Sequence, residues 1–181
     1  MSTLPDADAV ADEITKVLDA IDTRQKKDPF PDTGAWFQAI SGDLAVKLQP
    51  FGSRCYARNQ PLPCVGGEWL FDFCALLYDE ELPPQERFLT QAIAIGEVEW
   101  GTRSSQIDDD FEKLLVADAL VLFMIFEQWS RADAEVELDR LEKVAMRRQE
   151  FVRLRGINQP PIFLLSCWII PKGPFIHRKL N

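Results

Sequence analysis

The sequence predicts an α/β (α+β) fold in which a mixed central sheet is flanked by helices. Residues 6–22 place Val10, Ile14 and Leu18 at helical spacing, which is typical of an amphipathic helix. Residues 119–126 are apolar throughout, which indicates a strand covered on both faces. Two strand-like segments, 67–79 and 87–101, flank the polar stretch DEELPPQE. The chain is therefore predicted to contain both helices and buried strands, which is the α/β (α+β) class.

The first two expected elements are helices. Pro5 suits the first turn of the helix over 6–22, and the polar, proline-containing stretch 26–32 is expected to be a linker. A second helix is predicted from Asp32 or Thr33 to about Leu48, ended by Pro50 and Gly52. Its inward residues are expected to be Trp36, Phe37, Ile40, Leu44 and Leu48.

Three strands are expected next. Residues 53–59 form the first, and a turn over 61–67, rich in proline and glycine, follows it. The second strand lies in GEWLFDFCALLYD and the third in RFLTQAIAIGEVEWG. Because a short polar connection joins these two, an antiparallel hairpin is the expected pairing.

The remainder of the chain alternates helices and strands. A short helix is predicted over 109–116, its aspartate-rich start being suited to the helix dipole. The buried strand 119–126 follows, and then a long helix over 133–154 that Gly156 ends. The stretches PIFLLSCWII and FIHRKL are expected to form one strand or a strand pair.

Length, net charge and hydrophobic pattern limit the class of protein to which this chain can belong. A length of 181 residues predicts a single domain, 1–181, with a substantial core. The net charge of −9 argues against a basic coat for DNA, because phosphate binding depends on Lys and Arg. The acidic N-terminus lacks the apolar segment of a signal peptide, and the longest apolar runs are too short to span a bilayer. We therefore expect a cytoplasmic protein without membrane attachment.

The four cysteines, at 55, 64, 74 and 167, do not have the spacing of a common zinc site. Cys74 and Cys167 lie in apolar strands and are expected to be buried free thiols. For Cys55 and Cys64 two interpretations stay open, namely free thiols in a reducing compartment or a disulfide.

Three carboxylates stand out on the predicted hairpin. Glu97 and Glu99 share one face of their strand, about 7 Å apart, because strand side chains alternate. If Glu81 pairs with Phe88, Asp72 lies opposite Glu97 and points to the same side. A solvated edge strand would explain Glu97 and Glu99 alone, but the flanking residues are apolar on both faces. The three acids are therefore expected to lie at the mouth of a core, where a divalent cation would offset their repulsion.

The pattern resembles the PD-(D/E)xK, or restriction-endonuclease-like, superfamily, whose core order is helix, three strands, helix, strand. Asp72 matches its first acid and Glu97 its second, and the resemblance covers residues 33–127. Residues 1–32 would then be an N-terminal helix and linker, and 128–181 a C-terminal helix and strand extension. Two positions depart from the motif: Phe71 replaces the proline before the first acid, and Glu99 occupies the lysine position.

The resemblance implies a site and a reaction. Asp72, Glu97 and the backbone carbonyl of Val98 would hold Mg²⁺ or Mn²⁺, and Glu99 would position or deprotonate the attacking water or hold a second ion. Lys113, on the following helix, could supply the missing cation, although a surface lysine is the simpler interpretation. An additional family acid would be Asp43 or, less well matched, Glu68. The implied function is hydrolysis of phosphodiester bonds in DNA.

Other functions stay open from the sequence. The absent lysine and the acidic charge also fit a catalytically inactive member that acts as a regulatory or protein-interaction module, dimeric through its apolar C-terminal strand. A third alternative is a small acidic DNA mimic with a continuous negative surface. The cations of the long helix, Lys143, Arg147, Arg148, Arg153 and Arg155, fit either a solvated face or a phosphate-contacting stripe.

Overall fold

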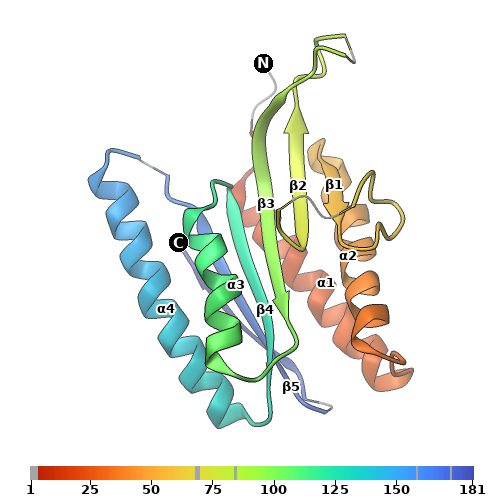
Figure 1. Cartoon of the computed structure of the whole chain (residues 1–181), viewed down its shortest axis with the longest axis vertical. Coiled ribbons are helices and arrows are strands. Elements are labelled where there is room, and N and C mark those ends of the chain that lie inside the picture. The colour runs from red at the N-terminus through yellow and green to blue at the C-terminus, as the bar shows by residue number, and fades with distance from the viewer. Residues whose placement is uncertain (1–3, 68–69, 84, 158, 172) are drawn as a thin grey trace.

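The computed structural model describes residues 4–67, 70–83, 85–157, 159–171 and 173–181. Within these ranges the chain forms one mixed six-stranded sheet with helices on both faces (Figure 1). The predicted α+β class with a mixed central sheet is confirmed. Across the same ranges, the length and apolarity that a transmembrane helix needs are not met by any helix.

The strands lie side by side in chain order. They are β1 (Arg54–Ala57), β2 (Phe73–Tyr78), β3 (Leu89–Glu99), β4 (Val121–Gln128), β5 (Ile162–Ile169) and β6 (Phe175–Leu180). The pairs β1–β2, β2–β3 and β5–β6 are antiparallel, whereas β3–β4 and β4–β5 are parallel. Parallel neighbours need a crossover, and the helices α3 (Ser104–Val116) and α4 (Arg131–Leu154) provide the two crossovers.

Two helices cover each face of the sheet. The helices α1 (Ala7–Lys27) and α2 (Thr33–Leu48) lie behind it in Figure 1, and α3 and α4 lie in front. The side chains of Asp6 and Asp32 cap α1 and α2, accepting hydrogen bonds from Asp8 N at 3.3 Å and Ala35 N at 2.7 Å. A short 3-10 turn, η1 (Gln49–Phe51), follows α2 and leads to β1.

The alternation along β3 decides which side chains meet which helices. Val98 packs in the core shared with α1 and α2, whereas Ile95 packs in the core shared with α3 and α4. Glu97, an even number of residues from Ile95, therefore faces α3. Gly96 permits close packing here, because a Cβ on it would lie 2.0 Å from Cζ of Phe123.

The start of α3 differs from the prediction. The helix begins at Ser104 rather than at Asp109, because Ile107 is fully buried and extends the apolar stripe of Phe111 and Leu114 back by one turn. Its first turn contains no acidic residue, so the prediction of an aspartate-rich helix start is wrong. Asp110 instead lies in the middle of the helix.

The hairpin register is as predicted at one end and not at the other. Phe73 pairs with Gly96, so Asp72 and Glu97 are the next residues in that register. Two register shifts, after Ala75 and after Leu77, change the pairing toward the tip. There Asp79 N donates to Phe88 O, so the predicted Glu81–Phe88 pair is wrong. Bulges of this kind add residues to one strand, and the pattern of apolar residues in the sequence does not reveal where they occur.

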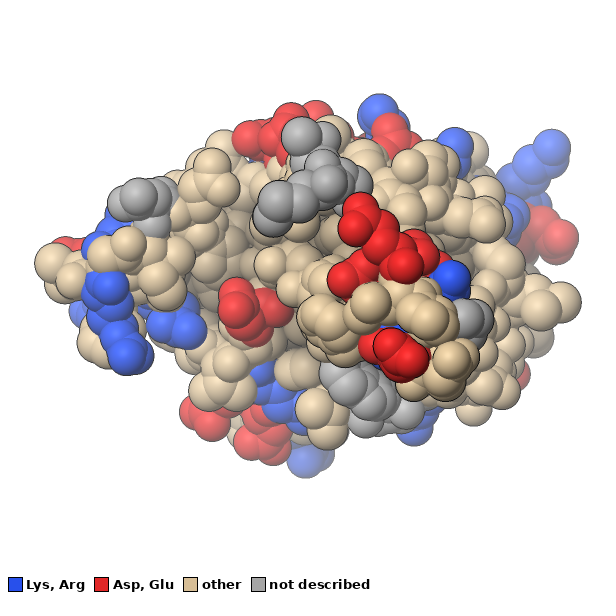
Figure 2. Space-filling view, turned by 90° about the horizontal axis from the view of Figure 1, so that it is seen from above, with Lys and Arg blue, Asp and Glu red and all other residues tan. Residues whose placement is uncertain are grey.

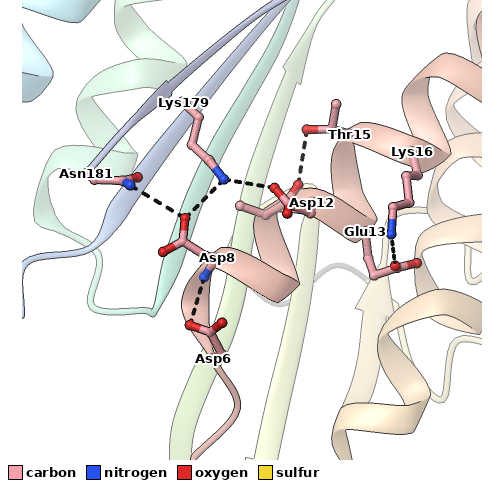
Figure 3. A network of polar contacts seen from close by, with 9 residues as sticks. Asp6, Asp8, Asp12, Glu13, Thr15, Lys16, Lys179 and Asn181 are labelled. Atoms are coloured by element: carbon pink, nitrogen blue, oxygen red, sulfur yellow. Dashed lines mark hydrogen bonds and ion pairs between the residues drawn. The ribbon is translucent and has the colours of Figure 1, made fainter.

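The C-terminal segment forms the strand pair β5–β6, one of the two predicted alternatives. Lys179 of β6 reaches α1, where Nζ lies 2.8 Å from Asp12 Oδ1 and 3.0 Å from Asp8 Oδ1. Asn181 Nδ2 also donates to Asp8 Oδ1 at 3.5 Å, as Figure 3 shows. These contacts fasten the end of the chain to its first helix.

All four cysteines are free and buried, so the alternative of a Cys55–Cys64 disulfide is not formed. Burial raises the pKa of Cys64 to about 11 and that of Cys74 to about 12. The thiols are therefore protonated at neutral pH and act as small apolar side chains.

Candidate functional site

The candidate site lies where β3 ends beside the start of β2. Asp72 immediately precedes β2 and retains 8% exposure, and Glu97 on β3 retains 1%. Asp72 Oδ2 accepts a hydrogen bond from Val98 N at 3.0 Å, which holds its carboxylate against the peptide that follows Glu97. The structure thus brings together the two acids that the motif singled out, and we call them the acid pair.

Burial and repulsion dominate the electrostatics of the acid pair. Burial and, next, the negative charge of Asp72 raise the pKa of Glu97 to about 8, and the nearby Lys113 ammonium offsets this only in part. The described residues give the buried Glu97 Oε1 no well-aligned hydrogen bond, although Lys113 Nζ lies 3.4 Å from it. Because the pKa of Glu97 stays raised despite this contact, the negative charge of the acid pair is only partly balanced, and a further cation would stabilise it.

Lys113 reaches the acid pair from α3. Its Nζ lies 3.4 Å from Glu97 Oε1, an ion pair between two elements, and 2.7 Å from Asp110 Oδ1. Burial opposes the charged ammonium, yet the hydrogen bond to Asp110 and the charge of Glu97 outweigh it and raise the pKa of Lys113. Lys113 is therefore a permanent cation at neutral pH. Lys113 thus contacts Glu97 from the helix that follows β3.

Glu99 does not join the acid pair in the predicted way. Gly101 N–H donates to Glu99 Oε1, which turns this carboxylate back toward the loop after β3. Burial raises the pKa of Glu99, and the adjacent Asp110 acts in the same direction. Across the described ranges no three His, Cys, Asp or Glu side chains are grouped closely enough to hold a metal ion. The cage of three carboxylates stays a prediction, and Glu99 Oε1 here accepts from Gly101 N–H.

The acid pair offers oxygen donors only, which is the donor type that Mg²⁺ and Mn²⁺ prefer. Mg²⁺ in proteins is commonly held by one or two carboxylates, with waters and substrate phosphate completing its octahedron. A pair of carboxylates in which the buried Glu97 Oε1 has only the 3.4 Å contact with Lys113 fits this ion without a third acidic ligand.

Two further residues at the site were not predicted. Asp110 lies between Lys113 and Glu99, and the spacing of Asp110 and Lys113 by three residues on one helix was the available clue. Arg58, which follows β1, places NH1 3.8 Å from Asp72 Oδ1, and its N–H donates to the Asp72 carbonyl at 3.1 Å. The sequence pattern contains nothing that would indicate the Arg58 contact.

One predicted candidate lies elsewhere, and another lies outside the described residues. Asp43, on α2, forms an ion pair with Arg24 of α1 at 3.3 Å, on the face of the sheet opposite to α3. It is therefore not part of the site. Glu68 lies outside the described residues.

A Ser–His–Asp line occurs away from the acid pair but lacks access for a substrate. Ser166 Oγ lies 2.9 Å from His177 Nδ1, and His177 Nε2 lies 3.4 Å from Asp19 Oδ1. Ser166 has 0% exposure, so no substrate carbonyl can reach its hydroxyl. We interpret the line as a structural link between β5, β6 and α1.

Comparison with protein-family models, with curated proteins and with solved structures gives no match to this chain.

Proposed function

We propose that the chain is a Mg²⁺- or Mn²⁺-dependent nuclease that hydrolyses phosphodiester bonds in DNA. The observation that carries this proposal is the approach of Lys113 Nζ to within 3.4 Å of the buried Glu97, beside Asp72. Two acids and one lysine at such short range are the groups that the PD-(D/E)xK motif brings together. Here the lysine comes from α3 rather than from β3.

The order of elements supports the same proposal. The helix α2, the strands β1, β2 and β3, the helix α3 and the strand β4 follow each other as helix, three strands, helix, strand. The two acids stand at the start of the second of these strands and near the end of the third. We propose on this basis that residues 33–127 form a restriction-endonuclease-like core.

Each side chain has a separate task in the proposed reaction. Asp72 and Glu97, with the Val98 carbonyl, would hold the divalent ion, which when bound lowers the pKa of water and polarises the scissile phosphate. Lys113 would neutralise the charge that grows on the phosphate oxygens in the transition state. Because its pKa is raised, it acts as a cation and not as a proton acceptor. Asp110 orients Lys113 through the 2.7 Å contact.

The test is cleavage of a supercoiled plasmid with Mg²⁺ or Mn²⁺ by wild type, Asp72→Asn and Glu97→Gln. We expect each variant to lose at least about 100-fold in rate, as is usual when a group acting on the transition state is removed. Asp43→Asn, on the opposite face, is the matched control and should cleave like wild type. Equal rates for wild type and both acid-pair variants would remove the catalytic claim.

A second function is a catalytically inactive, regulatory or protein-interaction module. The observation in its favour is that Lys113 and Arg58 already place positive charge beside Glu97 and Asp72. A protein that uses these cations as permanent partners needs no metal. Calorimetric titration separates the two functions: heat of binding with millimolar Mg²⁺ or Mn²⁺ that disappears in Glu97→Gln favours the nuclease, and no heat favours the module.

A further inference from the structure

The cations that lack an acidic partner are unevenly distributed. Among the described residues, the Lys and Arg side chains without an ion pair are Lys27, Lys47, Arg103, Lys143, Arg147, Arg148, Arg153 and Arg155. Five of these eight lie between residues 143 and 155, in the last turns of α4 and at its C-cap. We call these five the basic end of α4.

The charge of α4 is polarised along its length. In the first half, Glu135, Asp139 and Glu142 are all bound by Arg178 of β6 at 2.6–3.0 Å. In the second half, Glu150 is the acidic residue. Seen from above, the molecule gathers Lys and Arg at the left, over this part of α4, and Asp and Glu over the β2–β3 tip (Figure 2). A chain with net charge −9 thus gathers five cations without an ion pair at one end of α4.

The shape and chemistry of this surface suit a phosphate backbone. Lys143 and Arg147 are exposed and one helical turn apart, and with Arg153 they line a groove of about 690 Å³ against the end of β6, to which Glu142 and Glu150 also contribute. Beside the groove, Phe151 is 53% exposed and the Arg155 guanidinium lies 5.7 Å from its ring centroid. Arginine forks match phosphate oxygens, and an exposed aromatic ring offers a stacking surface for a base.

The basic end is linked to the acid pair through α3. Arg148 Nε donates to Leu115 O at 2.6 Å, which joins α4 to the C-terminal turn of α3. Two residues earlier on that helix, Lys113 extends to Glu97. These two contacts connect the basic end to α3 and α3 to the acid pair, although α3 also exposes Asp109 and Glu112.

We infer that the basic end of α4 binds the sugar–phosphate backbone of DNA and delivers it to the acid pair. This inference rests on the proposed nuclease function, which supplies the reason to prefer DNA to an acidic protein. Lys143 and Arg147 contribute through exposure and charge and do not touch the reacting atoms, so they belong to the binding surface and not to the catalytic machinery.

The experiment measures DNA binding without catalysis. Fluorescence anisotropy of a labelled duplex of about 20 base pairs is followed in EDTA, for wild type, Lys143→Glu/Arg147→Glu and the control Lys27→Glu/Lys47→Glu. The two double variants change the net charge equally, and all four positions are exposed. At about 50 mM salt we expect the α4 variant to bind at least 10-fold more weakly and to reduce the salt dependence by about two phosphate contacts. The control should stay within about 2-fold of wild type.

Several outcomes would overturn the inference. One is an equal loss of DNA affinity in both double variants, which would mean that binding depends on the net charge of the protein and not on this surface. Another is no binding by wild type at about 50 mM salt. A third is equally tight binding of polyglutamate at matched charge concentration, which would assign the surface to an acidic protein.

The nuclease proposal is tested separately. Plasmid cleavage that depends on Asp72 but is indifferent to Lys143→Glu/Arg147→Glu would overturn the binding surface and keep the nuclease. Localised binding without any metal-dependent cleavage would keep the surface as a DNA-binding one and remove the nuclease.

Discussion

Of the clusters in which several carboxylates contact one cation, those on β6 and on β3 differ in which polar atoms remain without a hydrogen bond. On β6, Arg178 contacts Glu135, Asp139 and Glu142 of α4 at 2.6–3.0 Å, and all of these groups are partly exposed. On β3, Lys113 meets Glu97 at 3.4 Å, and Glu97 Oε1 is buried without a hydrogen bond. The β6 cluster fits a role in fastening the sheet edge. The β3 cluster contains a destabilising electrostatic repulsion, which a bound ion and substrate would reduce.

The largest expected difference between the clusters is in catalysis. Lys113→Met should lower Mg²⁺-dependent plasmid cleavage by at least about 100-fold, because the transition state loses its fixed cation. Arg178→Met removes a cation with more acidic contacts, yet it should leave the cleavage rate within about 2-fold of wild type. Both variants are checked for folding by circular dichroism. Equal effects of the two substitutions would erase the proposed distinction.

The second largest difference is expected in the free energy of unfolding. Here the direction of the change, stabilising or destabilising, distinguishes the two clusters. The folded-state pKa of Glu97 is raised to about 8 from its ordinary value of 4.5, so between these values the native state holds a proton that the unfolded state has lost. The free energy of unfolding must therefore fall as the pH rises through this window. Glu97→Gln removes the penalty and should stabilise the metal-free protein at pH 8 by up to about 5 kcal/mol, at about 1.4 kcal/mol for each pKa unit.

Urea denaturation at about pH 5.5 and pH 8 measures this effect. Glu142→Gln, in the β6 cluster, is the matched control and should be neutral or slightly destabilising at both pH values. Glu127, whose pKa burial raises to about 7, adds a slope of the same sign to wild type and to the Glu97 variant alike. A Glu97→Gln protein that is less stable than wild type at pH 8 would contradict the account.

Asp110 should have an intermediate effect, because it acts through Lys113. Asp110→Asn keeps the shape of the side chain but weakens the 2.7 Å contact, and we expect about a 10-fold loss of cleavage, or about 1.4 kcal/mol. The loss should be small when Lys113 is already methionine, so a double-mutant cycle measures the coupling. Additive effects in that cycle would show that Asp110 does not position Lys113.

The smallest effect is expected at the edge of the sheet. Lys179→Met removes the ion pairs of β6 with Asp8 and Asp12, all of them on the surface. Surface pairs of this kind contribute about 0–1 kcal/mol, so the change in unfolding free energy should fall in that range. A loss of several kcal/mol would mean that the β6 contacts are more than surface pairs.

The acid pair could be predicted because it depends on local alternation and on one register. Glu97 shares its face with Ile95, and Asp72 lies one step beyond the Phe73–Gly96 pair. The error at the hairpin tip did not matter, since both register shifts fall beyond Cys74 on the tip side. Element order is robust for a similar reason, because each buried strand and amphipathic helix carries its own pattern.

The remainder of the site depends on contacts that no pattern encodes. Placing the start of α3 at Asp109 assigned the aspartates to a helix cap, although Asp110 in fact lies beside Lys113. Glu99 turns toward Gly101 because the chain bends after β3, and strand periodicity cannot indicate such a turn. Arg58 contacts Asp72 although the two residues lie far apart in the sequence, and no periodic pattern indicates such a contact.

Anomalous diffraction from crystals soaked in Mn²⁺ tests the central claim most directly, because it locates the ion. The account predicts a peak within about 2.5 Å of a carboxylate oxygen of both Asp72 and Glu97, with the Lys113 ammonium displaced from Glu97. Peaks only at surface acids, with Lys113 still 3.4 Å from an ion-free Glu97, would contradict it.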